Sequence, residues 1–239
     1  MTIAREGSRE IIIATLICAV IEFGVIALAL TVSLWFLTAC VPIWTLWVFV
    51  LLFFRDPSRT IPDQPGILVS PADGKVTEVS RLDHYDGVQG RALRISIFLS
   101  VFDVHINRVP CAGRVRKIEY KPGKFLDARH PDCGSLNESN TIEMDPGEGL
   151  PGPIIVRQVA GLIARRIICN IKEQDSVTRG QRLGLIKFGS RTDLIVPDTG
   201  GLEAAVQVND YVKGGETVLF RVKASGRSEV NRAAAVGAS

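Results

Sequence analysis

Three short motifs contain side chains that could carry out chemistry. V-S-P-A-D-G-K-V at 69–76 contains Asp73, F-D-V-H-I-N-R-V-P at 102–110 contains His105, and I-K-F-G-S-R-T-D-L-I-V-P at 186–197 contains the pair Gly189–Ser190. A serine hydroxyl becomes a nucleophile beside a general base, histidine titrates near neutrality, and a carboxylate can orient an imidazole. Each motif alone is weak, because Asp-Gly is usually a turn and lone histidines and Gly-Ser pairs are common.

In this order, and with F-F-R-D-P-S-R-T-I-P at 53–62 ahead of them, the motifs resemble the phosphatidylserine decarboxylase family in its short-chain form. The resemblance covers about residues 53–222, and an N-terminal hydrophobic block also fits it. It implies a carboxy-lyase of phospholipid biosynthesis that converts phosphatidylserine to phosphatidylethanolamine. The implied cofactor is a pyruvoyl group made from the chain itself, with no metal and no pyridoxal phosphate. Cleavage at Gly189–Ser190 would leave a β chain of 189 residues associated with an α chain of 50.

The residue types suit the chemistry that this resemblance implies. The hydroxyl of Ser190 can attack the carbonyl carbon of Gly189 and shift the acyl group from nitrogen to oxygen, and glycine permits the close approach. His105 is the expected general base, and Asp73 could orient its imidazole. The ester then eliminates, and hydrolysis leaves the pyruvoyl group. Its ketone can form a Schiff base with the substrate amine and accept electrons as carbon dioxide leaves.

Other charged residues could bind the substrate or take part in proton transfer. Arg108, Lys187 and Arg191 could attract its phosphate or carboxylate, or could simply be solvated charges. Longer members of the family carry a second histidine at the position of Arg108, and arginine cannot act as a base at neutral pH. His84 and His130 do not match the motif. Either His105 therefore serves both the cleavage and the protonation of the carbanion, or another group serves one of them.

These motifs follow a hydrophobic block between Glu10 and Arg55. The block has 44 residues, 36 of them hydrophobic, and its only charge is Glu22. A single helix of that length would be about 66 Å long, roughly twice a bilayer core. We therefore expect a hairpin with spans at 11–30 and 34–54 and a turn at 31–33, although Pro42 could kink or end a helix.

The flanks of the block predict its orientation. Arg5 and Arg9 precede it, and Arg55 and Arg59 follow it, so a hairpin places all four on one side. The positive-inside rule makes that side cytoplasmic, which predicts a cell-membrane protein with its catalytic domain on the cytoplasmic face. A re-entrant hairpin within one leaflet is the alternative. We assign residues 1–55 to the anchor.

Residues 56–225 read as a mainly β (α+β) catalytic domain, and 226–239 as a flexible tail. Apolar runs alternate with turn signals about every ten residues, at 95–101, 115–120, 154–159, 167–171 and 183–188. A short helix at 102–107 is possible. The segment 127–139, rich in Pro, Gly, Asp and Asn, is expected to be a surface loop.

Weak internal repeats refine this fold prediction. The pattern D-x-V-x-x-G at 175–180 recurs at 210–215, and P-x-x-G-x-V at 71–76 recurs at 110–115. Repeated turn–strand units predict a compact β sandwich or barrel sandwich. They also resemble biotinyl and lipoyl carrier domains, so a non-enzymatic membrane adaptor is a second hypothesis. No lysine stands at a tight turn as a carrier would need.

Composition limits the remaining classes. The net charge is +3, without a basic stripe, which does not favour nucleic-acid binding. The five cysteines form no C-x-x-C pair, which favours a reducing compartment for the soluble part and gives no metal-site spacing. The sequence leaves open whether the lipid is ester-linked or an archaeal ether-linked serine phospholipid, and whether the chain forms a homodimer.

Overall fold

The computed structural model describes residues 2–124, 126, 133–147, 149–161, 166–187 and 190–223. The chain forms two compact units, Met1–Ser58 and Arg59–Ser239. Each unit has its own architecture, and the predicted mainly β fold with an N-terminal helical hairpin is confirmed.

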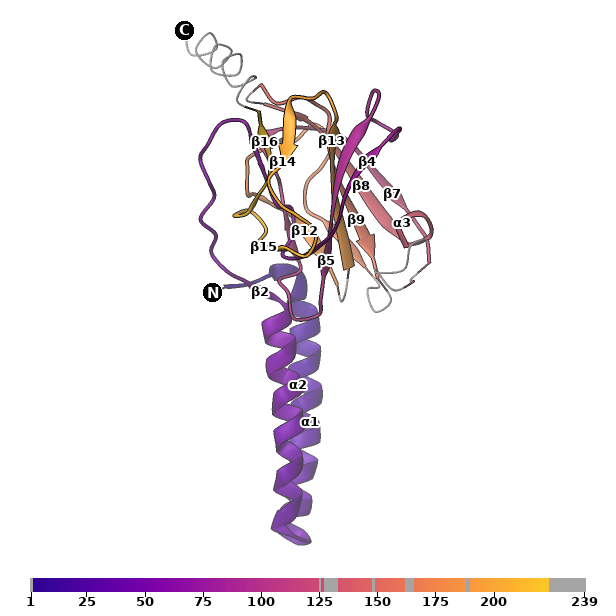
Figure 1. Ribbon diagram of the computed structural model, residues 1–239. Coiled ribbons are helices and arrows are strands. Elements are labelled where there is room, and N and C mark those ends of the chain that lie inside the picture. Colours follow the sequence, from indigo (N-terminus) through magenta and orange to yellow (C-terminus); the bar gives the residue numbers. More distant parts are fainter. Residues whose placement is uncertain are drawn as a thin grey trace. The chain divides into compact units, whose positions relative to one another are not determined.

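The first unit is a helical hairpin whose helices lie side by side (Figure 1). Its elements in chain order are β1 (Thr2–Ile3), η1 (Arg5–Gly7), α1 (Ser8–Thr31), η2 (Leu34–Ala39), α2 (Cys40–Phe53) and β2 (Arg55–Asp56). The chain reverses after Thr31, as predicted. Pro42 lies in the first turn of α2, where backbone N–H groups make no hydrogen bond within the helix, so a residue without an N–H is tolerated there. Trp47 Nε1 donates to Thr15 Oγ1 across the hairpin at 3.0 Å. The segments Arg5–Thr31 and Leu34–Phe53 are both long and apolar enough to cross a membrane.

Within the described residues, the second unit is built mainly from antiparallel strands. They are β3 (Ile67–Val69), β4 (Gly74–Leu82), β5 (Ala92–Leu99), β6 (Ile106–Arg108), β7 (Gly113–Lys121), β8 (Ser139–Pro146), β9 (Ile154–Ala160), β10 (Ile167–Cys169), β11 (Ser176–Val177), β12 (Arg182–Ile186), β13 (Ser190–Pro197), β14 (Leu202–Ala204), β15 (Tyr211–Val212) and β16 (Val218–Val222), with one short helix, α3 (Cys133–Leu136).

One large curled sheet and two small sheets enclose the core of this unit. The large sheet has the order β11-β7-β8-β9-β13-β5-β4-β15, and the small sheets have the orders β10-β12-β6 and β14-β16-β3. The main core joins alternate residues of the large sheet, such as Ile97 and Leu194, to Leu183 and Phe220 of the small sheets. The strand β13 is central in the large sheet, paired along its length with β5.

The repeated sequence patterns correspond to repeated structure. Val177 and Val212 lie in β11 and β15, the two edge strands of the large sheet. Asp175 and Asp210 each accept a hydrogen bond at 2.8 Å from the backbone N–H three residues earlier. The glycines that end the two patterns both adopt positive φ. The repeats therefore mark two equivalent turn–strand units on opposite edges of the sheet.

Two local predictions need correction. Residues 102–107 are not helical: the chain turns at Ser100–Asp103 and then enters β6, because Asp103 Oδ2 accepts from the backbone N–H of Ser100 at 2.7 Å and closes the turn. Within the loop predicted at 127–139, Cys133–Leu136 is the helix α3, and residues 127–132 lie outside the described residues. The predicted tail at 226–239 also lies outside them.

Candidate active site

Ser190 is the first residue of β13 and is fully buried. Its backbone is in register with Leu99 of β5 on one side and Ala160 of β9 on the other. Its Oγ has no hydrogen-bond partner within the described part of the chain. A buried hydroxyl without a partner costs free energy, which is most easily explained by a chemical role. Gly189, the other half of the predicted cleavage site, lies outside the described residues.

His105 is tied to the Ser190 end of β13 through two chain connections. The strand β5 ends at Leu99, the register partner of Ser190, and the turn that follows leads directly to His105. On the other side, Ile186 donates its backbone N–H to the carbonyl of His105 at 3.3 Å. Because Ser190 is four positions after Ile186, the Cα atoms of the two residues lie within about 14 Å of each other.

A main-chain contact determines that Nδ1 of the His105 imidazole carries a hydrogen. Nδ1 of His105 lies 2.9 Å from the carbonyl oxygen of Asp103, and the ring is fully buried. A carbonyl oxygen can only accept, so Nδ1 carries the proton. Whenever the ring is neutral, its lone pair is therefore on Nε2, the nitrogen that a general base would use.

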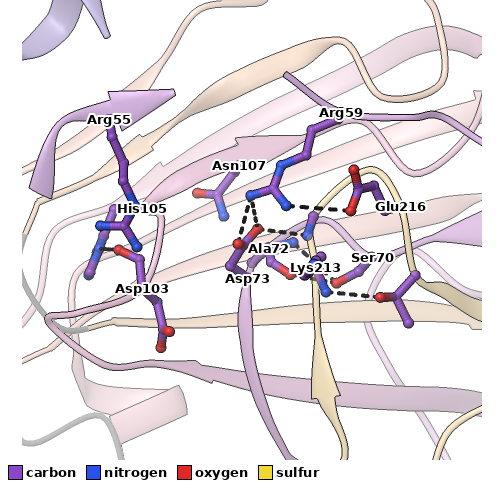
Figure 2. A network of polar contacts seen from close by, with 12 residues as sticks. Arg55, Arg59, Ser70, Ala72, Asp73, Asp103, His105, Asn107, Lys213 and Glu216 are labelled. Carbon is purple, nitrogen blue, oxygen red and sulfur yellow. Dashed lines mark hydrogen bonds and ion pairs between the residues drawn. The ribbon is translucent and has the colours of Figure 1, made fainter. Parts of the chain in front are cut away.

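Asp73 lies in a polar cluster with Arg59 and Glu216 (Figure 2). Two residues earlier, the carbonyl of Pro71 accepts hydrogen bonds from two residues of β6, Asn107 and Arg108. Its carboxylate accepts from Arg59 at 2.7 and 2.8 Å and from the backbone N–H of Gly214 at 2.8 Å. Burial raises the pKa of the Asp73 carboxyl above its ordinary value, although Arg59 and Gly214 act in the opposite direction. The hydrogen bonds of Asp73 go to Arg59 and Gly214, and Figure 2 places His105 beside Asp103.

A glycine lets the Asp73 turn form. Gly74 has a φ of +146°, and a Cβ at this position would stand 2.2 Å from the carbonyl oxygen of Phe98. The Asp-Gly pair is therefore a turn, and the same turn delivers a buried carboxylate.

The three predicted substrate-binding residues are not brought together. Arg108 donates to the carbonyl of Gly180 at 3.0 Å, and burial together with the neighbouring Arg59 lowers its pKa. Lys187 is largely buried and follows β12, three residues before Ser190. Arg191 alternates with Ser190 along β13 and so points to the opposite face of the sheet.

On that face Arg191 already has protein partners. It pairs with Asp193 at 2.6 Å and donates to Ser96 at 3.0 Å. Substrate binding by these three residues stays a prediction. His84 is exposed and lies beside Asp86, and His130 is outside the described residues.

Several residues of the site were not predicted from the sequence. Arg59 was assigned to the flank of the membrane block, yet it forms the buried ion pair with Asp73. Asn107 lies in the His105 motif and bonds to Thr192, two residues after the proposed nucleophile. Gln158 is a fully buried amide in a strand that is apolar apart from Gln158 and its neighbour Arg157, and this is the one signal that could have drawn attention to it.

Comparisons with known proteins agree with the motifs. The family model described as phosphatidylserine decarboxylase matches residues 46–220. The chain is 48% identical over 174 residues to a phosphatidylserine decarboxylase proenzyme of Desulfotalea psychrophila, an alignment that covers 73% of this chain and 79% of that protein. It is 40% identical over 218 residues to the phosphatidylserine decarboxylase proenzyme of Rhodopirellula baltica, an alignment that covers 91% of this chain and 87% of that protein. Identity to the proenzyme of Chlorobium chlorochromatii is 40% over 215 residues, covering 90% and 97%.

Proposed function

Because the chain belongs to the phosphatidylserine decarboxylase family, we propose that it is a proenzyme that cleaves itself at Gly189–Ser190 and then decarboxylates phosphatidylserine. The product is phosphatidylethanolamine. The observation that carries the proposal is the Ser190 hydroxyl, which is fully buried and without a partner among the described residues. Ser190 begins a central strand, and its register partner Leu99 ends the strand that leads through a turn to His105.

The side chains support a self-cleavage step. Ser190 Oγ attacks the carbonyl carbon of Gly189 while Nε2 of His105 takes the hydroxyl proton. The acyl group moves from the nitrogen of Ser190 to its oxygen, and His105 returns the proton to the nitrogen that leaves. The Asp103 carbonyl holds the required tautomer, which is the task that a carboxylate has in a Ser-His-Asp triad.

The Ser190 environment also fits the pyruvoyl group that the family implies, since residue 190 is buried and its reacting atom has no competing hydrogen bond among the described residues. The group supplies a ketone that acts as an electron sink when the carboxylate of the substrate leaves. Residue 190, the first residue of β13, would itself carry this group. Exclusion of water at this buried position would protect it.

We propose different roles for the remaining predicted residues. Asp73, through Arg59 and Gly214, holds the turn that faces β6, and any direct contact with His105 would require a rearrangement of that ion pair. Lys187 and Arg108 are the candidate cations for the phosphate or carboxylate of the lipid headgroup. Lys187 is the closer of the two to Ser190 along the chain.

The helical hairpin is proposed to anchor the enzyme in the cell membrane, with the catalytic unit on the cytoplasmic side. Two apolar helices and a lipid substrate support this location. The pairing of β1 with β2 brings the two ends of the hairpin together, so both flanks lie on one side. Arg59 is committed to Asp73, so the positive-inside signal would rest on Arg5, Arg9 and Arg55.

Intact mass analysis of the purified protein tests the proposal. We expect fragments of 189 and 50 residues, the smaller with a blocked, carbonyl-bearing N-terminus that reacts with hydroxylamine, together with release of carbon dioxide from phosphatidylserine vesicles. Ser190→Ala should leave one inactive 26.0 kDa chain. Ser135→Ala is the matched control, because Gly134–Ser135 is another Gly-Ser pair of the same chain. An active, uncleaved wild-type chain would refute the proposal.

A further inference from the structure

A series of hydrogen bonds joins three buried side-chain amides to the hydroxyl of Thr192, two residues after Ser190. Asn140 Nδ2 donates to Gln158 Oε1 at 3.0 Å, Gln158 Nε2 donates to Asn107 Oδ1 at 2.8 Å, and Asn107 Nδ2 donates to Thr192 Oγ1 at 3.1 Å. The four side chains come from β8, β9, β6 and β13, and each is at most 3% exposed. Side-chain networks this deeply buried are costly unless every member is satisfied, so each bond direction matters.

The carbonyl of Pro71 determines the donor-to-acceptor direction of all three hydrogen bonds in this series. Asn107 Nδ2 also lies 3.3 Å from this oxygen, which can only accept a hydrogen bond. The amide nitrogen of Asn107 must therefore face Pro71 and Thr192, and its oxygen must face Gln158. Gln158 is in turn obliged to present its nitrogen to Asn107 and its oxygen to Asn140. An amide flip at any member would place two donors or two acceptors opposite each other.

With the hydrogen bonds in this direction, the hydroxyl hydrogen of Thr192 takes no part in the series of bonds that ends at this residue. Thr192 uses a lone pair of its hydroxyl to accept from Asn107, so the hydroxyl hydrogen must point elsewhere. Within the described part of the chain, no acceptor is found for it. Thr192 lies two residues after Ser190 on the same face of β13, where the Cα atoms of alternate residues are about 6.6 Å apart. Ser190 Oγ has no partner among the described residues, so the contact between the two hydroxyls would form as Oγ moves during the reaction.

We propose that Thr192 is a catalytic hydrogen-bond donor to Oγ of residue 190 during self-cleavage. The proposal rests on the function proposed above and assigns Thr192 to one step of it, the elimination of the ester. In that step a base, for which His105 is the candidate, removes the Cα proton of residue 190. The electron pair forms the Cα–Cβ double bond, the Cβ–Oγ bond breaks, and Oγ leaves as part of the carboxylate of Gly189. The Thr192 hydroxyl stabilises the negative charge that develops on Oγ.

The test is maturation of full-length Thr192→Val and Thr192→Ser, followed over time by intact mass. Removing one such donor slows a reaction on the order of 100-fold, so Thr192→Val is expected to mature that much more slowly, and Thr192→Ser at nearly the wild-type rate. The stalled ester should accumulate in Thr192→Val. Hydroxylamine would then release a 50-residue fragment that begins with an intact serine instead of a pyruvoyl group. A purely structural role for Thr192 would not produce this fragment.

Two further variants separate the explanations. Thr77→Val is the matched control, because it removes a hydroxyl that donates to the carbonyl of Ser96 in the same sheet, and it should mature normally. Asn107→Asp offers Thr192 an acceptor and so removes its hydrogen from the site, and it should mature as slowly as Thr192→Val. Wild-type maturation of Thr192→Val, or equally slow maturation of Thr192→Ser, would overturn the assignment of the donor. A wild-type chain that never cleaves at 189/190 would instead refute the proposed function, and the Thr192 role with it.

Discussion

The ion pair between Arg59 and Asp73 gives a prediction with a definite magnitude. Both side chains are nearly buried, with exposed fractions of 6% and 11%, and they lie 2.7 Å apart. Removing one partner of such a pair leaves the other charge buried and costs about 3–5 kcal/mol. For a unit of this size, about 1 kcal/mol lowers the melting temperature by about 2–4 °C. Arg59→Met should therefore lower the melting temperature of the β unit by about 6–20 °C.

The measurement is best made in a Ser190→Ala background, in detergent, so that every sample is one chain of equal length. All three tryptophans lie in the helical hairpin, so the circular dichroism of the strands is the appropriate signal. Arg116→Met is the matched control, because Arg116 pairs with Asp145 at the surface, where both side chains are 51% exposed. An exposed pair contributes about 0–1 kcal/mol, so the control should shift by at most about 4 °C.

A double variant distinguishes a buried pair from two independent contacts. Arg59→Met with Asp73→Asn removes both charges while the amide oxygen can still accept from Gly214. We expect it to recover at least half of the loss seen in Arg59→Met alone. An unchanged melting temperature in Arg59→Met, or a double variant whose loss equals the sum of the single losses, would refute the reasoning.

Four further outcomes follow from the site. His105→Asn keeps a donor for the Asp103 carbonyl but removes the base, so the uncleaved 26.0 kDa chain should accumulate on a denaturing gel, and normal maturation would exclude His105 as the base. Gly74→Ala places a Cβ against a backbone oxygen at positive φ and should cost at least about 1–3 kcal/mol in thermal unfolding, whereas wild-type stability would contradict the observed turn. Burial raises the folded-state pKa of Asp73 above its unfolded value of 3.8, so the stability that protonated Asp73 contributes is present below pH 3.8 and is lost as pH rises through the raised pKa. The free energy of unfolding of the wild type relative to Asp73→Asn, measured against pH, should therefore fall in that window, and a rise would contradict the argument. Arg191→Met should lower the melting temperature with KM for phosphatidylserine unchanged, and a tenfold rise in KM would instead support substrate binding by Arg191.

Much of the fold could be predicted because its signals are local. Apolar runs bounded by turn residues predicted strands that the structure contains, such as β7 and β9, and the offset repeats predicted turn–strand units, which the structure places on two sheet edges. The possible helix at 102–107 was wrong because a side-chain contact, from Asp103 to Ser100, stops the chain from continuing as a helix. Strand order depends on pairings between distant segments, for which a single sequence has no local signal.

The site shows the same division between local and distant information. Ser190 and His105 stand out within short motifs, and motif order was sufficient to name them. The partner of Asp73 was missed because an arginine beside a hydrophobic block is equally well explained as a membrane flank. The bond from Asn107 to Thr192 joins residues 85 positions apart, and only the folded sheet brings them together.

The position of the proposed cut explains how one chain could become two without losing its fold. The strand β13 begins at Ser190 and pairs with β5 and β9, both of which would lie in the larger fragment. Downstream, β15 pairs with β4 and β16 pairs with β3, so the smaller fragment is held by two different sheets. Residue 190 would thus be fixed by backbone pairing on both sides before and after the proposed cleavage. The same pairing that would hold the fragments together would also hold residue 190 in place, on the same face of β13 as Thr192, while its chemistry proceeds.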